Sequence, residues 1–227
     1  MPRTRVKICG ICRAADALAA ADAGADAIGI NFDPASPRNV SIAQASEIVR
    51  AVPPFISVIG LFVDADVAAI SKVMEEIPLS AVQLHGHESP ELVAKMKPLP
   101  VIKVVRTDEG DELPVWHKAI DGLKLTNLLG ILMETPRSMA GMSGGSGVSN
   151  DWPRLHDLNR AGRFQRLGAL IVAGGLTAEN VGDVIRLLRP FAVDVSSGVE
   201  SGKREKSAEK ITAFIRAVRE ADARLES

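Results

Sequence analysis

Cysteine is scarce in this chain, and neither sign of charge is in excess. The 227 residues include two cysteines, Cys9 and Cys12, too few for a secreted disulfide framework, although their close spacing leaves a redox pair open. Lysine and arginine number 27 against 28 aspartates and glutamates, so the net charge of −1 provides no broad positive field for nucleic acid. We therefore expect no nucleic-acid partner and interpret the short basic run at 203–206 as a solvated surface.

Long hydrophobic runs are missing as well. No segment approaches the roughly 20 consecutive apolar residues that cross a bilayer, and Ile56 to Val63 is only as long as a buried strand. Met1 to Arg5 lead straight into a short strand, without the apolar core and cleavage pattern of an export signal. We expect a cytoplasmic protein with no membrane partner.

Short apolar, β-rich runs recur along the whole chain. They are Arg5 to Cys9, Ala27 to Phe32, Ile56 to Val63, Ala81 to Leu84, Val101 to Val105, Leu129 to Met133, Ala169 to Val172, and Ala192 to Val195. Most are continuously apolar, which is typical of strands buried on both faces of a parallel sheet.

Helical patterns separate these runs. Three begin with recognisable signals: Ser41 with Gln44 as a capping box, Ser89 before Pro90, and Thr177 ahead of an apolar stripe. The last helix is expected from about Ser207. Between 107 and 124, Pro114 and its neighbours interrupt the pattern, so we expect a short or distorted fifth helix.

Eight strand–helix units predict an α/β protein, a (β/α)8 TIM barrel that residues 1–227 form as a single domain, with two domains as the alternative. An open doubly wound sheet has fewer strands as a rule, and a glycine fingerprint follows the first of them. Here Cys9-Gly10-Ile11 follows the first strand. We therefore expect no nicotinamide or flavin cofactor.

In a barrel, catalytic groups lie at the carboxyl ends of strands, and phosphate is often bound after strands seven and eight. The loops at 173–177 and 194–204 stand there, and the paired Gly174 and Gly175 allow backbone N–H groups to approach an anion. Alone, either loop could be an ordinary turn. The irregular loop at about 134–151 also follows a strand end and is expected to be either a functional lid or disordered.

Cys9 ends the first strand, where a thiol would point into the mouth of the barrel as a nucleophile or base. An inert core cysteine is the alternative, and we interpret Cys12 as a packing residue. His85 and His87 could suggest a metal pair, but the sequence offers no third ligand at a telling spacing.

Six motifs in chain order resemble those of the phosphoribosylanthranilate isomerases. They are Lys7-Ile8-Cys9-Gly10-Ile11, Ser36-Pro37-Arg38, Val82-Gln83-Leu84-His85-Gly86, Gly144-Gly145-Ser146-Gly147 with Asp151-Trp152, Ala173-Gly174-Gly175-Leu176, and Asp194-Val195-Ser196-Ser197-Gly198-Val199-Glu200. Each motif is short, but together they span residues 7 to 200 in the order the family has them.

The resemblance implies an Amadori rearrangement of N-(5-phosphoribosyl)anthranilate in tryptophan biosynthesis, without metal or cofactor. Cys9 looks like the general base, Arg38 like the group that holds the anthranilate carboxylate, and Asp194 like a ribose contact. The other implied substrate contacts are Gln83, His85, Gly145, Gly174, Gly175, Ser196, Ser197 and Gly198. The partner is thus a small phosphorylated substrate, and we favour a monomer, with a homodimer as the alternative.

The match departs from the family at the general acid. The family has aspartate at the end of the sixth strand, and this chain has Glu134, whose extra methylene moves the carboxyl by about an ångström, enough to cost on the order of a hundredfold in rate. Three hypotheses stay open: a working isomerase with Glu134 as the acid, an isomerase of a related phosphorylated sugar amine, and a non-catalytic phosphate-ligand-binding relative.

Overall fold

The computed structural model describes residues 3–106, 112–134 and 151–226, and eight parallel strands of this part close into a barrel. The barrel strands are β1 (Arg5–Cys9), β2 (Ala27–Asn31), β3 (Ser57–Phe62), β4 (Ala81–Leu84), β5 (Val101–Val105), β6 (Leu128–Met133), β7 (Ala169–Val172) and β8 (Ala192–Val195). Each strand pairs with the next, and β8 pairs with β1, with Lys7 in register with Asp194. The predicted (β/α)8 barrel is confirmed, and no predicted strand end is wrong by more than one residue.

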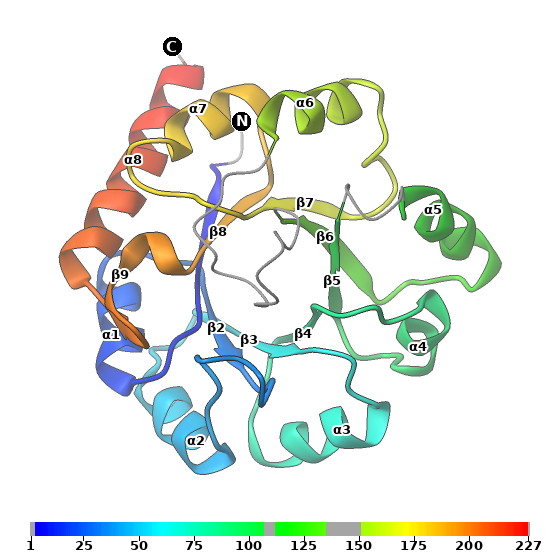
Figure 1. Cartoon of the computed structure of the whole chain (residues 1–227), viewed down its shortest axis with the longest axis horizontal. Helices are drawn as coiled ribbons and strands as arrows, with labels where there is room; N and C mark the ends of the chain where they lie inside the picture. Colours follow the sequence, from blue (N-terminus) through cyan, green and yellow to red (C-terminus); the bar gives the residue numbers. More distant parts are fainter. Residues whose placement is uncertain (1–2, 107–111, 135–150, 227) are drawn as a thin grey trace.

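Helices surround the barrel and follow the strands in turn (Figure 1). They are α1 (Ala14–Asp22), α2 (Ile42–Ala51), α3 (Val67–Glu76), α4 (Pro90–Lys95), α5 (Leu113–Gly122), α6 (Trp152–Arg160), α7 (Val181–Leu188) and α8 (Ala208–Glu226). A 3-10 turn, η1 (Ser197–Val199), and a small hairpin of β9 (Glu200–Gly202) and β10 (Glu205–Lys206) lie between β8 and α8. Within the described ranges, no helix is long and apolar enough to cross a membrane.

The strands divide the interior into two apolar cores. Successive side chains of a strand point to opposite faces. Ile8 therefore lies in the large core between strands and helices, whereas Ile102 and Val104 belong to a smaller core inside the barrel. Because both faces of each strand are buried, the strands read as continuous apolar runs.

Two of the predicted helix starts are confirmed. Ser41 caps α2 by accepting from the Gln44 backbone N–H at 3.2 Å, and Gln44 returns the bond to Ser41, so the capping box is complete. Ser89 precedes α4 with Pro90 in the first turn.

Two helix expectations are wrong. The helix after Thr177 begins only at Val181, because the Asn180 side chain accepts from the Thr177 N–H at 2.8 Å and holds a turn ahead of the helix. The fifth helix is neither short nor broken: α5 is a continuous helix of 10 residues. Pro114 lies in its first turn, where its missing N–H leaves no intrahelical bond unmade.

The last helix ties the two ends of the chain together. Asp222 on α8 accepts from the backbone N–H of Thr4 at 2.8 Å and from its hydroxyl at 2.6 Å. The Arg219 guanidinium donates to the Thr4 carbonyl at 2.7 Å. α8 lies beside both α1 and α7 (Figure 1), so the ring of helices closes where the barrel closes.

Candidate active site

The carboxyl ends of the strands bring most of the predicted site residues to one mouth of the barrel. Two clusters of polar side chains form there, one on β1 and β8 and one on β4, β5 and β6. Figure 1 shows these two groups of strands facing each other across the barrel.

The first cluster is built around Lys7. Its ammonium lies 2.9 Å from Oδ1 of Asp194, and both side chains are almost fully buried. Lys7 lies on the same side of β1 as Cys9, and its ammonium is a near neighbour of the Cys9 sulfur. Gly29 on β2 leaves the space for this contact, since a Cβ built there would lie 2.8 Å from Sγ of Cys9 and 3.1 Å from Nζ of Lys7.

Burial and charge act in opposite directions in this cluster. Burial opposes the charge of Lys7, but the Asp194 carboxylate outweighs it, so the pKa of Lys7 is raised. Burial also raises the pKa of the Cys9 thiol, and the neighbouring Lys7 and Lys206 ammonium groups offset only part of that rise. Cys9 is thus a buried thiol beside a permanent positive charge.

The second cluster is a chain of three side chains. Nε2 of Gln83 lies 3.1 Å from Nδ1 of His85, and Nε2 of His85 lies 2.6 Å from Oε2 of Glu134. With the Gln83 amide donating to Nδ1, the other ring nitrogen carries the proton and donates to Glu134. Arg106 supports the chain by donating to the His85 carbonyl at 3.0 Å.

Glu134 is held in its charged form. Burial works to raise its pKa, but the contact with His85 and the positive charges of Arg106 and Lys7 outweigh it, so the pKa of Glu134 is lowered. Within the described residues, Oε1 of Gln83 and Nε of Arg106 are buried without a hydrogen-bond partner. Buried groups of this kind are few in native proteins, and a catalytic role is one of the reasons for which they are retained.

Arg38 lies at the rim of the first cluster with its guanidinium already engaged. Its Nε and Nη2 donate to the two Glu200 oxygens at 2.7 and 2.8 Å, a bidentate pair. Burial raises the pKa of Glu200, but Arg38 and Lys206 outweigh this, so the pKa is lowered. Two N–H groups of Nη1 and one of Nη2 stay outside this pair and could meet a second carboxylate.

The basic run at 203–206 is only in part the solvated surface we expected, since Lys203 and Glu205 are exposed but Arg204 and Lys206 are not. Lys206 has a fully buried side chain, and its ammonium donates to the Ser196 carbonyl and to Glu200, each at 3.0 Å. Arg204 donates to the carbonyls of Pro37 and Asn39. The run folds back as β10 onto the loop that carries Arg38, a tertiary contact that composition alone does not reveal.

The two glycine loops lie side by side. Gly174 and Gly175 both have positive φ, and within the described ranges no hydrogen bond engages their backbone N–H groups. A Cβ on Gly198 would collide with the Leu176 carbonyl, so only glycine lets the two loops approach. Ser196 and Ser197 continue this edge of the mouth.

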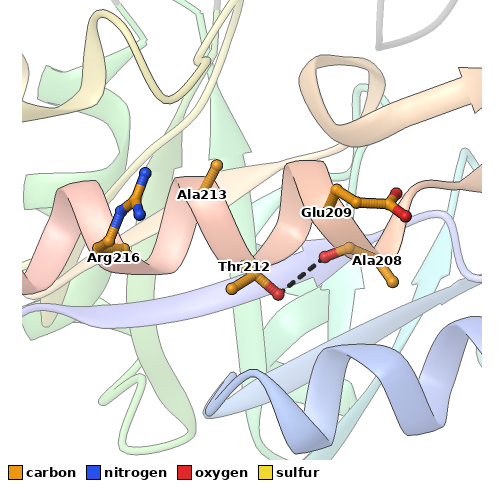
Figure 2. Close-up of a pocket in the computed structure, with 5 residues that line it drawn as sticks. All are labelled: Ala208, Glu209, Thr212, Ala213 and Arg216. Carbon is orange, nitrogen blue, oxygen red and sulfur yellow. Dashed lines mark hydrogen bonds between the residues drawn. The ribbon is translucent and has the colours of Figure 1, made fainter.

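Other expectations lie outside these clusters. Gly145 falls outside the described residues. In the part of the chain that the structure describes, no three His, Cys, Asp or Glu side chains gather as a metal site, and the metal-free reaction stays a prediction. Cys12 is buried in the large core, as expected of a packing residue. An open hollow on α8 (Figure 2) is lined by none of the candidate residues.

Comparison with known proteins identifies the family of this chain. A family model for N-(5'-phosphoribosyl)anthranilate isomerase matches residues 6–217. The chain belongs to this isomerase family. An isomerase of this name from Pseudomonas putida GB-1 is 44% identical over 222 residues, which cover 97% of this chain and 100% of that one. One from Pseudomonas aeruginosa LESB58 is 43% identical over 220 residues, or 96% and 97% of the two chains.

Solved structures of phosphoribosylanthranilate isomerases share the fold. The Thermotoga maritima enzyme has a TM-score of 0.79 at 37% identity, and covers 96% of this chain and 99% of its own. A phosphoribosylanthranilate isomerase in complex with reduced 1-(o-carboxyphenylamino)-1-deoxyribulose 5-phosphate has a TM-score of 0.77 at 36% identity, with the same coverage. The resemblance and the enzyme class inferred from the motifs are therefore confirmed.

Several residues of this isomerase's mouth were missed by sequence reasoning. Lys7 was read only as part of a motif, although a charge inside an apolar strand is itself a signal. Lys206 stands in a run of charged residues, and such a run is typical of an exposed surface. Glu200 stood in the last motif, but no local pattern pairs it with Arg38, 162 residues away.

Proposed function

We propose that the protein catalyses the Amadori rearrangement of N-(5-phosphoribosyl)anthranilate to 1-(2-carboxyphenylamino)-1-deoxyribulose 5-phosphate in tryptophan biosynthesis. The observation that carries the proposal is the pairing of Cys9 and Glu134 on opposite sides of a barrel mouth edged by two glycine loops. Family membership supports it.

The reaction needs one acid and one base. The acid gives a proton to the ring oxygen, the C1–O bond breaks with its electron pair leaving on oxygen, and the nitrogen lone pair forms a C=N bond. The base then takes the proton from C2, the C–H electrons form a C1=C2 bond, and the C=N electrons return to nitrogen. Tautomerisation of the resulting enol produces the ketose, so protons and electrons balance.

In this proposal Glu134 is the acid and Cys9 the base. The lowered pKa of Glu134 means that the free protein holds it as a carboxylate. A substrate carrying a phosphate and a carboxylate brings negative charge into the mouth, and negative charge raises the pKa of a nearby carboxyl. With the substrate bound, Glu134 then takes up a proton that it can pass to the ring oxygen, and the His85 N–H at 2.6 Å keeps the carboxyl in place.

The remaining groups bind the substrate. Arg38 uses the N–H groups that Glu200 leaves open to hold the anthranilate carboxylate. Gly174 and Gly175 offer the phosphate backbone N–H groups that no described residue engages, with Ser196, Ser197 and Gly198 beside them. Asp194 accepts a hydrogen bond from Lys7 with one oxygen and can accept one from a ribose hydroxyl with the other. Gln83 offers the ligand its Oε1, which no described residue engages.

Turnover of freshly prepared phosphoribosylanthranilate, followed by loss of its fluorescence, tests the proposal. We expect activity in the wild type and a loss of at least about a hundredfold in kcat in both Cys9→Ala and Glu134→Gln. Glu220→Gln on the outer face of α8 is the control and should keep full activity. An inert wild type that binds the substrate would overturn the proposal and favour a non-catalytic relative; activity on another sugar amine alone would favour a diverged isomerase.

We also infer that the protein works as a monomer in the cytoplasm. A substrate with a phosphate and a carboxylate is too highly charged to cross a bilayer unaided, so enzyme and substrate must share a compartment. The candidate groups described above all come from one chain. A size-exclusion mass near twice the 24.1 kDa of the chain would contradict the monomer.

A further inference from the structure

Lys7 has no part in the acid–base pair, yet it lies fully inside the barrel. It alternates with Ile8, which faces the helices, and so points to the same side of β1 as Cys9. A buried ion pair such as Lys7 with Asp194 is weak evidence of stabilisation, because apolar replacements are often neutral or better. A charge kept at this position therefore calls for a functional reason.

The surroundings fix the ammonium in one place. Asp194 holds it from the neighbouring strand at 2.9 Å, in register with Lys7. Gly29 has no side chain to separate the ammonium from the sulfur, and both atoms lie around the space a Cβ would fill. Lys7 is thus aimed at Cys9 by covalent spacing, strand register and packing together.

A thiol in this position needs a cation to act as a base. Burial disfavours the thiolate, and a positive charge in hydrogen-bonding contact favours it. The charged groups acting on the sulfur are Lys7 on β1, Asp194 on β8, Lys206 on β10 and Arg38 in the loop after β2. Of these cations, Lys7 lowers the pKa of the thiol most, and its ammonium borders the same small space over Gly29 as the sulfur.

We propose that Lys7 is a positioning residue for the base: its ammonium, held by Asp194, stabilises the thiolate of Cys9 from which the proton of C2 is accepted. The inference rests on the proposed function in one respect, namely that the proton accepted by the thiolate is the C2 proton of the substrate. The coupling between the ammonium and the thiolate is a property of the free protein.

The test measures the thiol directly. A Cys12→Ser background leaves Cys9 as the sole cysteine, and its alkylation by iodoacetamide is followed from pH 6 to 10. Lys7→Met should move the midpoint upward by at least about one pH unit, which lowers the rate near neutral pH about tenfold. Lys7→Gln, which can still donate to Asp194, should show the same shift if Lys7→Met does not fold, and Lys7→Arg should restore the midpoint.

Lys103→Met is the matched control. Lys103 is also a buried ammonium 2.9 Å from a carboxylate, that of Glu88. It alternates with Ile102 and Val104, which lie inside the barrel, so it points away from Cys9. This variant removes a similar buried charge and should leave the midpoint unchanged.

The outcomes separate the two proposals. An unchanged midpoint in folded Lys7→Met and Lys7→Gln, or an equal shift in Lys103→Met, would overturn the role of Lys7. If the midpoint shifts as expected but the wild type turns nothing over, the coupling stands and the proposed function fails. If both hold, the acidic limb of kcat/KM against pH should move by the same amount as the alkylation midpoint.

Discussion

Three charged side chains in the mouth, Lys7, Arg38 and Glu134, are each held in place by a partner. Asp194 holds Lys7 against Cys9, Glu200 holds Arg38, and His85 holds Glu134. A paired side chain loses little further conformational freedom when a ligand arrives, so the site is arranged before binding. The longer side chain of Glu134 is also accounted for, because it reaches His85 at 2.6 Å.

Arg38→Lys tests the binding of the anthranilate carboxylate. Lysine offers a point charge in place of a planar fork that serves two carboxylates at once. We expect KM to rise about tenfold, with a smaller change in kcat, in steady-state kinetics. Arg204→Lys is the control, because Arg204 supports the same loop through the Pro37 and Asn39 carbonyls without reaching a carboxylate there. An equal rise of KM in both variants would mean that Arg38 only supports the loop and does not bind the carboxylate.

Among the elements, the proposed phosphate site depends on two loops that approach each other closely. The loop after β7 and the turn η1 meet where the Leu176 carbonyl faces Gly198. The helix that follows is not the direct neighbour of the glycines, since α7 begins at Val181. Backbone N–H groups of the loops, more than a helix terminus, are therefore available for the anion.

Gly198→Ala should separate these two loops. The added Cβ would overlap the Leu176 carbonyl, a backbone atom that cannot turn aside, and overpacking of this kind costs about 1–3 kcal/mol. We expect a lower free energy of unfolding in urea and weaker competitive inhibition by inorganic phosphate. Gly202→Ala is the control in the same region, because a Cβ there meets nothing within 4 Å. If phosphate inhibits the two variants equally, its site lies elsewhere.

For the whole molecule, acid should weaken the fold through its buried carboxylates. The pKa values of Glu134 and Glu200 are lowered in the folded state. A lowered pKa stabilises the fold above the unfolded carboxyl pKa of about 4.3, and this contribution is lost as the pH falls through the folded values. The raised pKa of Lys7 stabilises the fold throughout the neutral range, and this contribution to stability is lost only in strong alkali.

Urea unfolding at a series of pH values checks this sign. We expect the contribution of these carboxylates to be constant from pH 8 to 6 and to fall below about pH 4.3. Glu200→Gln should be less stable at pH 7, because it leaves Arg38 and Lys206 without their carboxylate, and its stability should depend less on pH in the acid range. A wild type that gains stability on acidification would contradict the assignment of these charges.

The strands and the family of this protein could be predicted from short stretches of its amino-acid sequence. Apolar runs such as Val101 to Val105 are continuous because both faces of each strand are buried, and this local signal placed every strand to within a residue at each end. The motifs identified the family for the same reason, since each is a short stretch of chain at one strand end. Helix starts were less well placed where a side chain such as Asn180 added a turn.

The side chains that work together are brought into contact by the folding of the whole barrel. Lys7 and Asp194 are 187 residues apart, and Arg38 and Glu200 are 162 apart. Their contacts exist because the first and last strands pair and because β9, which begins with Glu200, lies next to the loop that carries Arg38. Local periodicity reports which residues are buried, but the partner of a buried charge depends on how the barrel closes, and that information is not present in any single stretch of sequence.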